Sequence, residues 1–534
     1  MVSAPEPQAR VSGIPAWRPL EPPPAPESGA TQTASVVITG AGPVGLAMAI
    51  DLAQRGHRVV VLGKFAFVPA GSKAICFSKR SLDILDRLGV GEKSVEKGVT
   101  WNVGKVFWKD SRDPVYQFDM LPVKNQKMPG FINLQQYHME DLLLERAAQL
   151  PNIDFRPGHE VVAFETGQTS SLLTVQRGDD RYSIKADWVI ACDGYRSFIR
   201  RAMGLDFEGR VFEDNFLIAD IRMDDDRPAE RWFWFDPPFN PGQSALMHKQ
   251  PDGVWRLDFQ LGWGIDRAAA VQPENVEPLV RAMLGDDVEF KEEWYSVYTF
   301  QCRRMGKFVH DRVIFAGDSA HLVSPFGARG CNGGFADIDN LGWKLDLILR
   351  DKADGRLLST YDHEAVAAAD ANIEASSRST DFLTPKSEIS TIFRDAVLEL
   401  AREFPFGRQW VNSGRLSVAI AYPDSPLNTP DVDEWEDRGI APGAVAVDAP
   451  FGSGYFLEQL KGEFVLLTAG PTGPYDGLHI VEVPDDADVL RARYGLESGG
   501  AYLLRPDQYV AARWKSPDAE AVASALARAK GATA

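Results

Sequence analysis

One short turn, "GAGPVG", constrains the fold of this chain more than any other feature. It places Gly40, Gly42 and Gly45 between a strand-like run, "SVVIT", and a helix-like run, "PVGLAMAIDLAQRG". In such a turn the first glycine makes the bend, the second lets the backbone approach a pyrophosphate, and the third lets the helix pack on the sheet. The helix start then faces the phosphates with its positive end. Because a second strand-like run, "RVVVLG", follows, the pattern predicts a parallel α/β unit that binds a dinucleotide.

Two further strand ends carry acidic side chains. "DWVIACDG" places Asp193 and Gly194 after an apolar run, and "DRVIFAGDSAH" places Asp318 after another. Acids that follow strands and open into glycine-rich turns suit the hydroxyl and phosphate groups of a nucleotide. Downstream, "PFGARGCNGG" predicts a helix start whose N–H groups stabilise negative charge on a bound ligand.

Length and charge narrow the class of protein. A chain of 534 residues is too long for one ordinary domain, and 44% hydrophobic with 25% charged residues is typical of a soluble globular protein. The formal net charge of -18 argues against nucleic acid or an anionic membrane as partner. The 4 cysteines form no CxxC pair, so we expect no metal site and a reducing, cytoplasmic location. No apolar run approaches the roughly 18 residues that span a bilayer.

The three motifs, in this order and spacing, resemble those of the para-hydroxybenzoate hydroxylase family of single-component, FAD-dependent aromatic hydroxylases. The resemblance covers roughly residues 35–400 and is strongest to members that hydroxylate 3-(3-hydroxyphenyl)propionate and other phenols. It implies an α/β fold in which a Rossmann-like FAD-binding domain is interleaved with a β-sheet substrate domain. Residues 443–534 are similar to the thioredoxin-like appendage of several phenol hydroxylases; they contain no cysteine, which excludes thiol redox chemistry.

The chain is therefore expected to divide into five parts. Composition predicts a disordered, Pro-rich arm over residues 1–33, because few large apolar side chains are present to offset the entropy of ordering. The other expected parts are an FAD-binding domain over 34–205 and 301–412, a substrate-binding β domain over 206–300, a linker over 413–442 and the thioredoxin-like domain over 443–534.

The resemblance implies a specific reaction. NADPH or NADH reduces FAD, the reduced flavin and O2 form a C4a-hydroperoxide, and this group delivers OH to a small aromatic substrate. The sequence does not separate NADH from NADPH, and it leaves association into a homodimer open. Two other functions also stay open: an FAD-dependent halogenase or dehydrogenase on the same fold, and a non-catalytic FAD-binding protein.

Site residues follow from matching the family motifs to this chain. The residues matched to cofactor binding are Gly40, Gly42, Gly45, Lys73, Gln135 (with Gln136 as the alternative), Asp193, Gly194, Asp318, Gly327, Arg329, Gly330 and Asn332. His248, Arg256 and Pro325 are matched to catalysis, and His248, Gln250 and Trp234 to substrate contact. His248 and Gln250 stand where the benzoate hydroxylase has a serine and an arginine that hold the substrate carboxylate, so para-hydroxybenzoate is not the expected substrate. For Trp234, on a strand-like run, core packing is the competing interpretation.

One position departs from the family pattern. The family has a glutamate at the end of the second strand, where it receives the adenosine ribose hydroxyls, and this chain has Gly63. A hydrogen bond to a charged group is worth roughly 1.5–3 kcal/mol, which corresponds to about a ten- to hundredfold change in affinity. We therefore expect FAD to dissociate more readily than it does from family members with the glutamate.

Overall fold

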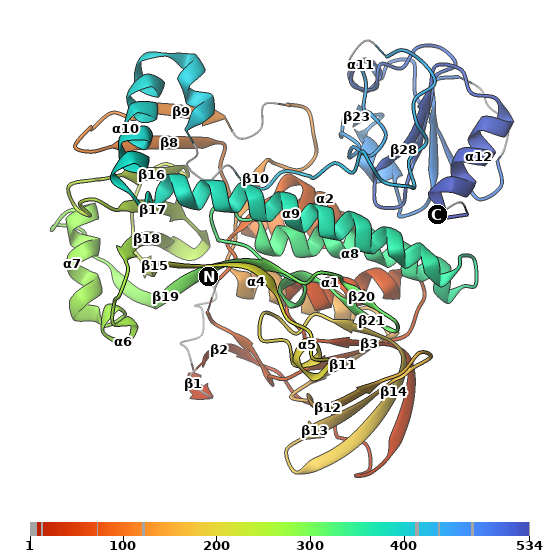
Figure 1. The fold of residues 1–534 in the computed structure, drawn as a ribbon, viewed down its shortest axis with the longest axis horizontal. Coiled ribbons are helices and arrows are strands. Elements are labelled where there is room, and N and C mark those ends of the chain that lie inside the picture. Colours follow the sequence, from red (N-terminus) through yellow and green to blue (C-terminus); the bar gives the residue numbers. More distant parts are fainter. Residues whose placement is uncertain are drawn as a thin grey trace.

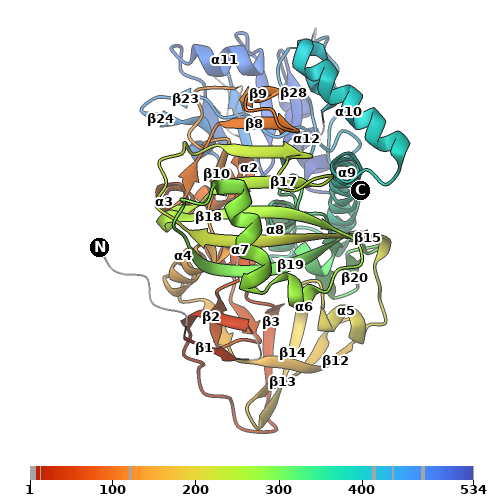
Figure 2. The same cartoon turned by 90° about the vertical axis from the view of Figure 1, so that its left-hand side faces the viewer.

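The computed structural model describes residues 8–11, 14–71, 73–119, 123–411, 416–435, 438–470 and 475–532. Three sheets carry its architecture, with the long helix α9 (Leu358–Leu383) running across them (Figure 1). Figure 2 views the same molecule from the side of the second sheet.

The first sheet is parallel at its centre, as the glycine turn predicts. Its parallel strands follow the order β11, β4, β3, β14 and β21. Strand bounds in this sheet are β3 (Thr31–Thr39), β4 (Val59–Gly63), β11 (Ile153–Pro157), β12 (Glu160–Thr166), β13 (Ser171–Arg177), β14 (Asp180–Ala191), β20 (Val309–His310) and β21 (Val313–Phe315). Strand β3 forms because its β-branched run is buried on both faces, with Val36, Val37 and Ile38 fully inaccessible.

The same sheet brings the three motifs together. Ala191 at the end of β14 lies opposite Thr39 of β3 on one side and Phe315 of β21 on the other. The loops that follow these strands therefore start at one level of the sheet. The carboxyl edge of a parallel sheet is where ligands bind in such folds.

Helices cover this sheet. Helix α1 (Pro43–Gln54) packs against α4 (Gln136–Ala148) and α8 (Gly330–Leu349), and α8 packs against α9. Shorter helices are α2 (Lys79–Arg87), α3 (Gly91–Lys97) and α5 (Phe198–Ala202). Helix α6 (Arg267–Ala270) precedes α7 (Pro273–Leu284), which packs on the second sheet described below. Among the described residues, no helix is long and apolar enough to cross a membrane.

The second sheet draws strands from more of the chain than the sequence predicted. Its order is β22-β19-β15-β18-β17-β16-β8-β9. The bounds are β8 (Val103–Trp108), β9 (Tyr116–Asp119), β15 (Glu208–Arg222), β16 (Arg231–Phe235), β17 (Ser244–Lys249), β18 (Val254–Gly262), β19 (Lys291–Arg304) and β22 (His321–Leu322). Strands β8 and β9 lie in residues 34–205, which were assigned to the FAD-binding part. They join this sheet because β8 pairs with the distant β16.

The predicted disordered arm is wrong for residues 14–33. Strand β2 (Ile14–Pro19) pairs with β5 (Phe67–Pro69), and β3 begins at Thr31. Trp17 stacks on Tyr137 of α4 with ring centroids 4.2 Å apart and donates a hydrogen bond from Nε1 to Asp141 at 2.8 Å. The contacts of Trp17 and the pairing of β2 with β5 hold this segment in place, and its composition did not suggest either. Residues 1–7 and 12–13 lie outside the described residues.

The C-terminal part forms a separate four-stranded sheet in the order β26-β25-β27-β28 (upper right of Figure 1). Its elements are β25 (Val465–Thr468), β26 (His479–Glu482), α11 (Asp488–Tyr494), β27 (Ala501–Leu504), β28 (Val510–Trp514) and α12 (Ala519–Ala529). The pair β25 and β26 is parallel, and β27 is antiparallel to both β25 and β28. Its thioredoxin-like character stays a prediction.

Buried charges join this part to the helices. Glu364 of α9 accepts from Lys344 of α8 at 2.7 Å and from Arg505 at 2.6 Å, and all three side chains are fully buried. Arg505 also pairs with Asp507 at 2.5 Å. Within the predicted linker, Leu427 and Trp435 are buried, so the described residues of this segment pack against the rest of the chain.

Candidate active site

A cavity of about 380 Å³ lies between the carboxyl edge of the first sheet and one face of the second sheet. Its first wall comes from loops of the first sheet and from the start of α8. That wall includes Gly42, Lys73, Gln136, Gly194, Tyr195, Asp318, Pro325, Gly327, Arg329 and Gly330. The opposite wall comes from the second sheet and includes Phe216, Ile218, Arg231, Leu246, His248, Arg256, Asp258, Tyr298 and Phe300. Most predicted site residues therefore meet in one place.

A larger cleft of about 1250 Å³ lies between the helices of the first part and the C-terminal part. No predicted site residue lines it. Charged side chains on its walls pair with one another: Arg87 with Asp51 at 2.6 Å, and Lys127 with Glu458 at 2.8 Å. The larger cleft is thus a polar junction between two parts of the chain. We place the active site in the smaller cavity.

The glycine turn leaves room for a ligand at one of its three glycines. Gly40 has φ +100°, and a Cβ there would lie 2.2 Å from the Cys192 carbonyl oxygen; a Cβ on Gly45 would lie 2.0 Å from the Gly40 oxygen. A Cβ on Gly42 meets no atom within 4 Å among the described residues, and Gly42 lines the cavity. Among the residues that the structure describes, no side chain caps the start of α1. Its N–H groups are therefore available to an anion in the cavity.

The other loops add polar groups to the same wall. Asp318 lies just beyond β21, with its side chain exposed toward the cavity. The ammonium of Lys73 lies 5.2 Å from the centre of the Tyr195 ring. Helix α8 begins at Gly330 without a side-chain cap, so a second helix start faces the cavity. This wall therefore has protein groups that can bind the hydroxyl, phosphate and ring-carbonyl groups of a ligand.

Besides Gly40 and Gly45, which shape the turn itself, three predicted cofactor residues lie off the cavity wall. Gln135 is the N-cap of α4, and its side chain turns away to donate to the Pro251 carbonyl at 3.2 Å, so its neighbour Gln136 lines the cavity instead. Asp193 caps α5 by accepting the N–H groups of Phe198 at 2.7 Å and Ile199 at 3.2 Å. Asn332 ties α8 to the strand before α2, because it accepts from the Ser78 N–H and donates to the Cys76 carbonyl, both at 2.9 Å.

On the second sheet, Arg256 is held by a buried carboxylate. Its Nε and Nη2 donate to the two oxygens of Asp220, each at 2.7 Å. Burial alone would lower the pKa of Arg256, but Asp220 raises it, so the side chain stays charged beside the cavity. Gln250 does not reach the cavity: it lies behind Arg256 and donates to Asp220 at 3.2 Å.

Trp234 also lies away from the cavity, which contradicts its predicted contact with substrate. Successive residues of a strand point to opposite faces, and Phe233 and Phe235 occupy the buried face of β16. Trp234 stacks on Phe107 instead, with ring centroids 5.2 Å apart. Core packing, the competing interpretation, is what the structure shows.

Two charged residues of the cavity were not found from the sequence. Arg231 of β16 lies opposite His248 of β17, which in turn lies opposite Arg256 of β18. Asp258 lies two residues beyond Arg256 on the same strand, with Oδ2 4.0 Å from the Nε2 of His248. No local motif marks Arg231 or Asp258; only the register of β16, β17 and β18 brings them together.

These groups have unusual ionisation. Burial, opposed by Arg256, raises the pKa of Asp258 to about 7. Burial and then the charges of Arg231 and Arg256 lower the pKa of His248 well below its usual value, so its imidazole is neutral. The Nδ1 of His248 is buried and has no hydrogen-bond partner among the described residues. Burial also raises the pKa of Tyr298 to about 12.

The model of one protein family, described as "FAD binding domain", matches residues 33–376. The chain belongs to the FAD-binding domain family. The match covers the first sheet from Thr33 of β3 onward and the whole second sheet. FAD fits the cavity wall described above, because a phosphate has open space at Gly42 and two uncapped helix starts face the cavity.

Several known proteins are similar to this FAD-binding chain. A 3-(3-hydroxy-phenyl)propionate/3-hydroxycinnamic acid hydroxylase of Klebsiella pneumoniae subsp. pneumoniae is 26% identical over 517 residues, which cover 90% of this chain and 92% of the relative. A protein of the same name from Shigella sonnei is 30% identical over 377 residues, covering 69% of this chain and 66% of the relative.

Solved structures agree in fold. The flavin-dependent monooxygenase PieE, in complex with FAD and substrate, superposes with a TM-score of 0.79 at 21% identity, covering 93% of this chain and 99% of the other. The rebeccamycin biosynthetic enzyme REBC gives 0.74 at 23% identity, covering 95% and 100%. The p-nitrophenol 4-monooxygenase PnpA of Pseudomonas putida gives 0.62 at 23% identity, covering 73% and 100%.

Proposed function

We propose that this chain is an NAD(P)H-dependent FAD monooxygenase that hydroxylates a phenolic or other aromatic small molecule. Two hydroxylases of such substrates are among its relatives, and one of them matches over nine tenths of the chain. The observation that carries the proposal is the cavity itself. Two loops suited to a dinucleotide, at Gly42 and Asp318, face a charged group of Arg231, His248, Arg256 and Asp258 across it.

We assign the holding of FAD to the first wall. The N–H groups at the start of α1 would bind the pyrophosphate beside Gly42, with Lys73 close by. Asp318 would accept from the ribityl hydroxyls. The start of α8 at Gly330 would place its positive end at the flavin ring, beside Pro325 and Arg329. When bound and reduced by a nicotinamide nucleotide, FAD supplies the activation of O2.

The second wall would hold and ionise the substrate. Phe216, Leu246 and Phe300 give an apolar surface on which an aromatic ring can pack and from which water is excluded. The positive charges of Arg231 and Arg256 favour the phenolate over the phenol. A phenolate ring is richer in electrons and accepts an electrophilic oxygen more readily.

Asp258 is the proton acceptor that this wall offers. A general base works best with a pKa near the working pH, and burial brings the pKa of Asp258 to about 7. His248, held neutral, is suited to orient the substrate hydroxyl by a hydrogen bond rather than to carry charge. Arg256 then has a second role, since its charge opposes burial and keeps the pKa of Asp258 from rising further.

A substrate screen tests this function. The protein is supplied with FAD, and the oxidation of NADPH and of NADH is followed under air with a panel of phenols and hydroxylated aryl acids. We expect one class of these compounds to accelerate the oxidation and to gain 16 mass units, the mass of one oxygen atom. Product that requires halide, or turnover that persists without O2, would replace the proposal with a halogenase or a dehydrogenase.

A further inference from the structure

The turn between β27 and β28 is buried, although it joins two strands of a hairpin. Connecting turns normally run over the protein surface, where water satisfies their backbone groups. Here all residues from Arg505 to Tyr509 are buried, and the accessible fractions of Arg505, Asp507 and Gln508 are only 1%, 0% and 2%. We call these five residues the β27–β28 turn. The tip of this hairpin contacts the helices of the FAD-binding part instead of solvent.

Gln508 has an unfavourable backbone conformation in this turn. Its φ of +61° lies in the left-handed region, which glycine and asparagine occupy more readily than glutamine. The side chain explains the residue type, because its Oε1 accepts a hydrogen bond from Nη1 of Arg80 at 2.5 Å. The carbonyl oxygen of Asp507 accepts from Nη2 of the same guanidinium at 2.7 Å. Residues strained in this way persist where the surrounding contacts hold them, often at functional sites.

Arg80 connects the β27–β28 turn to two helices. It lies in the first turn of α2, and its Nη2 also donates to Asp339 of α8. Asp339 accepts in addition from Arg87, at the end of α2, at 2.6 Å. Because the guanidinium of Arg80 is buried, its acceptors must come from the protein, and the turn supplies two of them. Loss of the Gln508 side chain would leave a buried, charged donor without its acceptor, which is costly.

The chain just before Arg80 forms part of the cavity wall. Residues 73–76 line the cavity, and strand β6 (Cys76–Ser78) joins them to the start of α2. Asn332 of α8 holds both ends of β6 by the two hydrogen bonds described above. Helix α8 itself begins at Gly330, which also lines the cavity. The contact between α2 and α8 therefore determines where this part of the wall stands.

We propose that the β27–β28 turn positions the FAD site: through Gln508 and Arg80 it fixes the contact between α2 and α8 and so raises the affinity of the cavity for FAD. The inference rests on the assignment of FAD to the first wall under the proposed function. It gives the C-terminal part, which has no cysteine for thiol chemistry, a role in cofactor binding. Gln508 and Arg80 are positioning residues in this account, since neither lines the cavity.

The variant Gln508→Gly tests the proposal in the full-length protein. Glycine adopts a positive φ without strain, so the turn keeps its conformation while Arg80 loses one acceptor. We expect the affinity for FAD to fall about tenfold, as for the loss of one hydrogen bond to a charged group. The affinity is measured by fluorescence titration at a temperature at which circular dichroism shows every variant to be folded.

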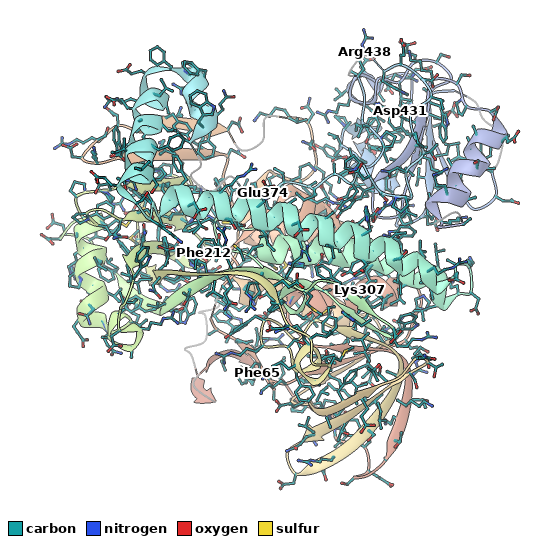
Figure 3. All side chains as sticks on the ribbon, in the orientation of Figure 1. Phe65, Phe212, Lys307, Glu374, Asp431 and Arg438 are labelled. Atoms are coloured by element: carbon teal, nitrogen blue, oxygen red, sulfur yellow. The ribbon has the colours of Figure 1, made fainter. Side chains whose placement is uncertain are left out.

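Two control variants separate this effect from a general loosening of the chain. Asp351→Gly replaces another residue with a left-handed backbone, at φ +55°, in the exposed loop after α8. Asp431→Asn removes a contact of the C-terminal part itself, because Asp431 accepts from Arg513 of β28 at 2.6 Å. Figure 3 places Asp431 in the upper half of this part, away from α9. Neither control should change the affinity for FAD.

A double-mutant cycle and hydrogen exchange test the route through Arg80. Arg80→Lys keeps a positive charge beside Asp339 but offers fewer donors than a guanidinium. Because Gln508 acts through Arg80 in this account, Gln508→Gly should have little further effect on FAD binding in the Arg80→Lys background. Hydrogen exchange followed by mass spectrometry should show faster exchange over residues 73–80 of Gln508→Gly, as well as in the turn.

Several results would overturn the proposal. They are a wild-type affinity for FAD in Gln508→Gly, an equal loss of affinity in the controls, fully additive effects in the cycle, and faster exchange confined to residues 505–514. A wild-type protein that takes up no FAD would contradict the proposed function together with this inference. Unaltered FAD binding in Gln508→Gly contradicts this inference alone.

Discussion

At the scale of single residues, the carboxyl group of Asp258 lies where burial makes its ionisation costly. If it accepts the substrate proton, it must be deprotonated, and its pKa is about 7. We therefore expect kcat/KM to rise as the pH increases through 7 and this rise to disappear in Asp258→Asn. His248→Gln is the matched control: because the pKa of His248 lies well below its usual value, its loss should lower the rate but keep the rise. An unchanged pH profile in Asp258→Asn would remove the assigned base.

The same carboxylate should have a measurable effect on stability. Its folded-state pKa lies above the value of 3.8 for an unfolded chain, so the folded state loses stability as the pH rises from about 4 to about 7. Asp258→Asn removes the ionisable group. We expect its melting temperature to exceed that of the wild type at pH 8 and the difference to shrink toward pH 5.

Gly63 gives a second test at this scale. A Cβ there would lie 3.0 Å from the Cβ of Ala41, which is a close contact, so any side chain requires a small shift. Comparing Gly63→Glu with Gly63→Ala cancels this shift and leaves the carboxylate. We expect the glutamate variant to bind FAD ten- to a hundredfold more tightly than the alanine variant, since a charged hydrogen bond is worth roughly 1.5–3 kcal/mol. Equal affinities by fluorescence titration would show that Gly63 does not weaken FAD binding.

At the scale of elements, two glycines of the turn before α1 have different roles, one in folding and one in binding. A Cβ on Gly40 collides with the Cys192 carbonyl, whereas one on Gly42 enters open space in the cavity. Gly40→Ala should therefore lower the melting temperature of the FAD-free protein by several degrees. Gly42→Ala should leave it unchanged but weaken FAD binding at least tenfold, because the methyl group occupies the approach to the phosphates. Equal effects of both variants on FAD binding would contradict the assigned phosphate site.

Some elements could be predicted from the sequence and others could not. β3, α1 and β4 were predictable because strand, glycine turn and helix follow one another locally. β8 was not, because its partner β16 lies more than a hundred residues away and no local pattern encodes that pairing. Arg231 and Asp258 were missed for the same reason, since their place in the cavity depends on strand register. The N-cap geometry at Gln135 leaves its neighbour Gln136 on the cavity wall, a difference that motif spacing does not resolve.

At the scale of the whole molecule, Glu364 connects three parts of the chain. It lies on α9, pairs with Lys344 of α8 and with Arg505 of the C-terminal part, and all three are fully buried. Removing one charge from a buried network leaves its partners uncompensated, at a cost of roughly 3–5 kcal/mol. Glu364→Gln should thus lower the melting temperature by several degrees and detach the C-terminal part first, as seen by limited proteolysis. Asp354→Asn, an exposed carboxylate near the start of α9, should have no such effect.

The central claim is that one oxygen atom of the product comes from O2, and isotope labelling tests it most directly. The FAD-loaded protein is incubated with NADPH or NADH, its best aromatic substrate and ¹⁸O2, and the product is analysed by mass spectrometry. A monooxygenase inserts one atom of ¹⁸O into each product molecule. Product that takes its oxygen from water, or nucleotide oxidation without any oxygenated product from the whole substrate panel, would contradict the account.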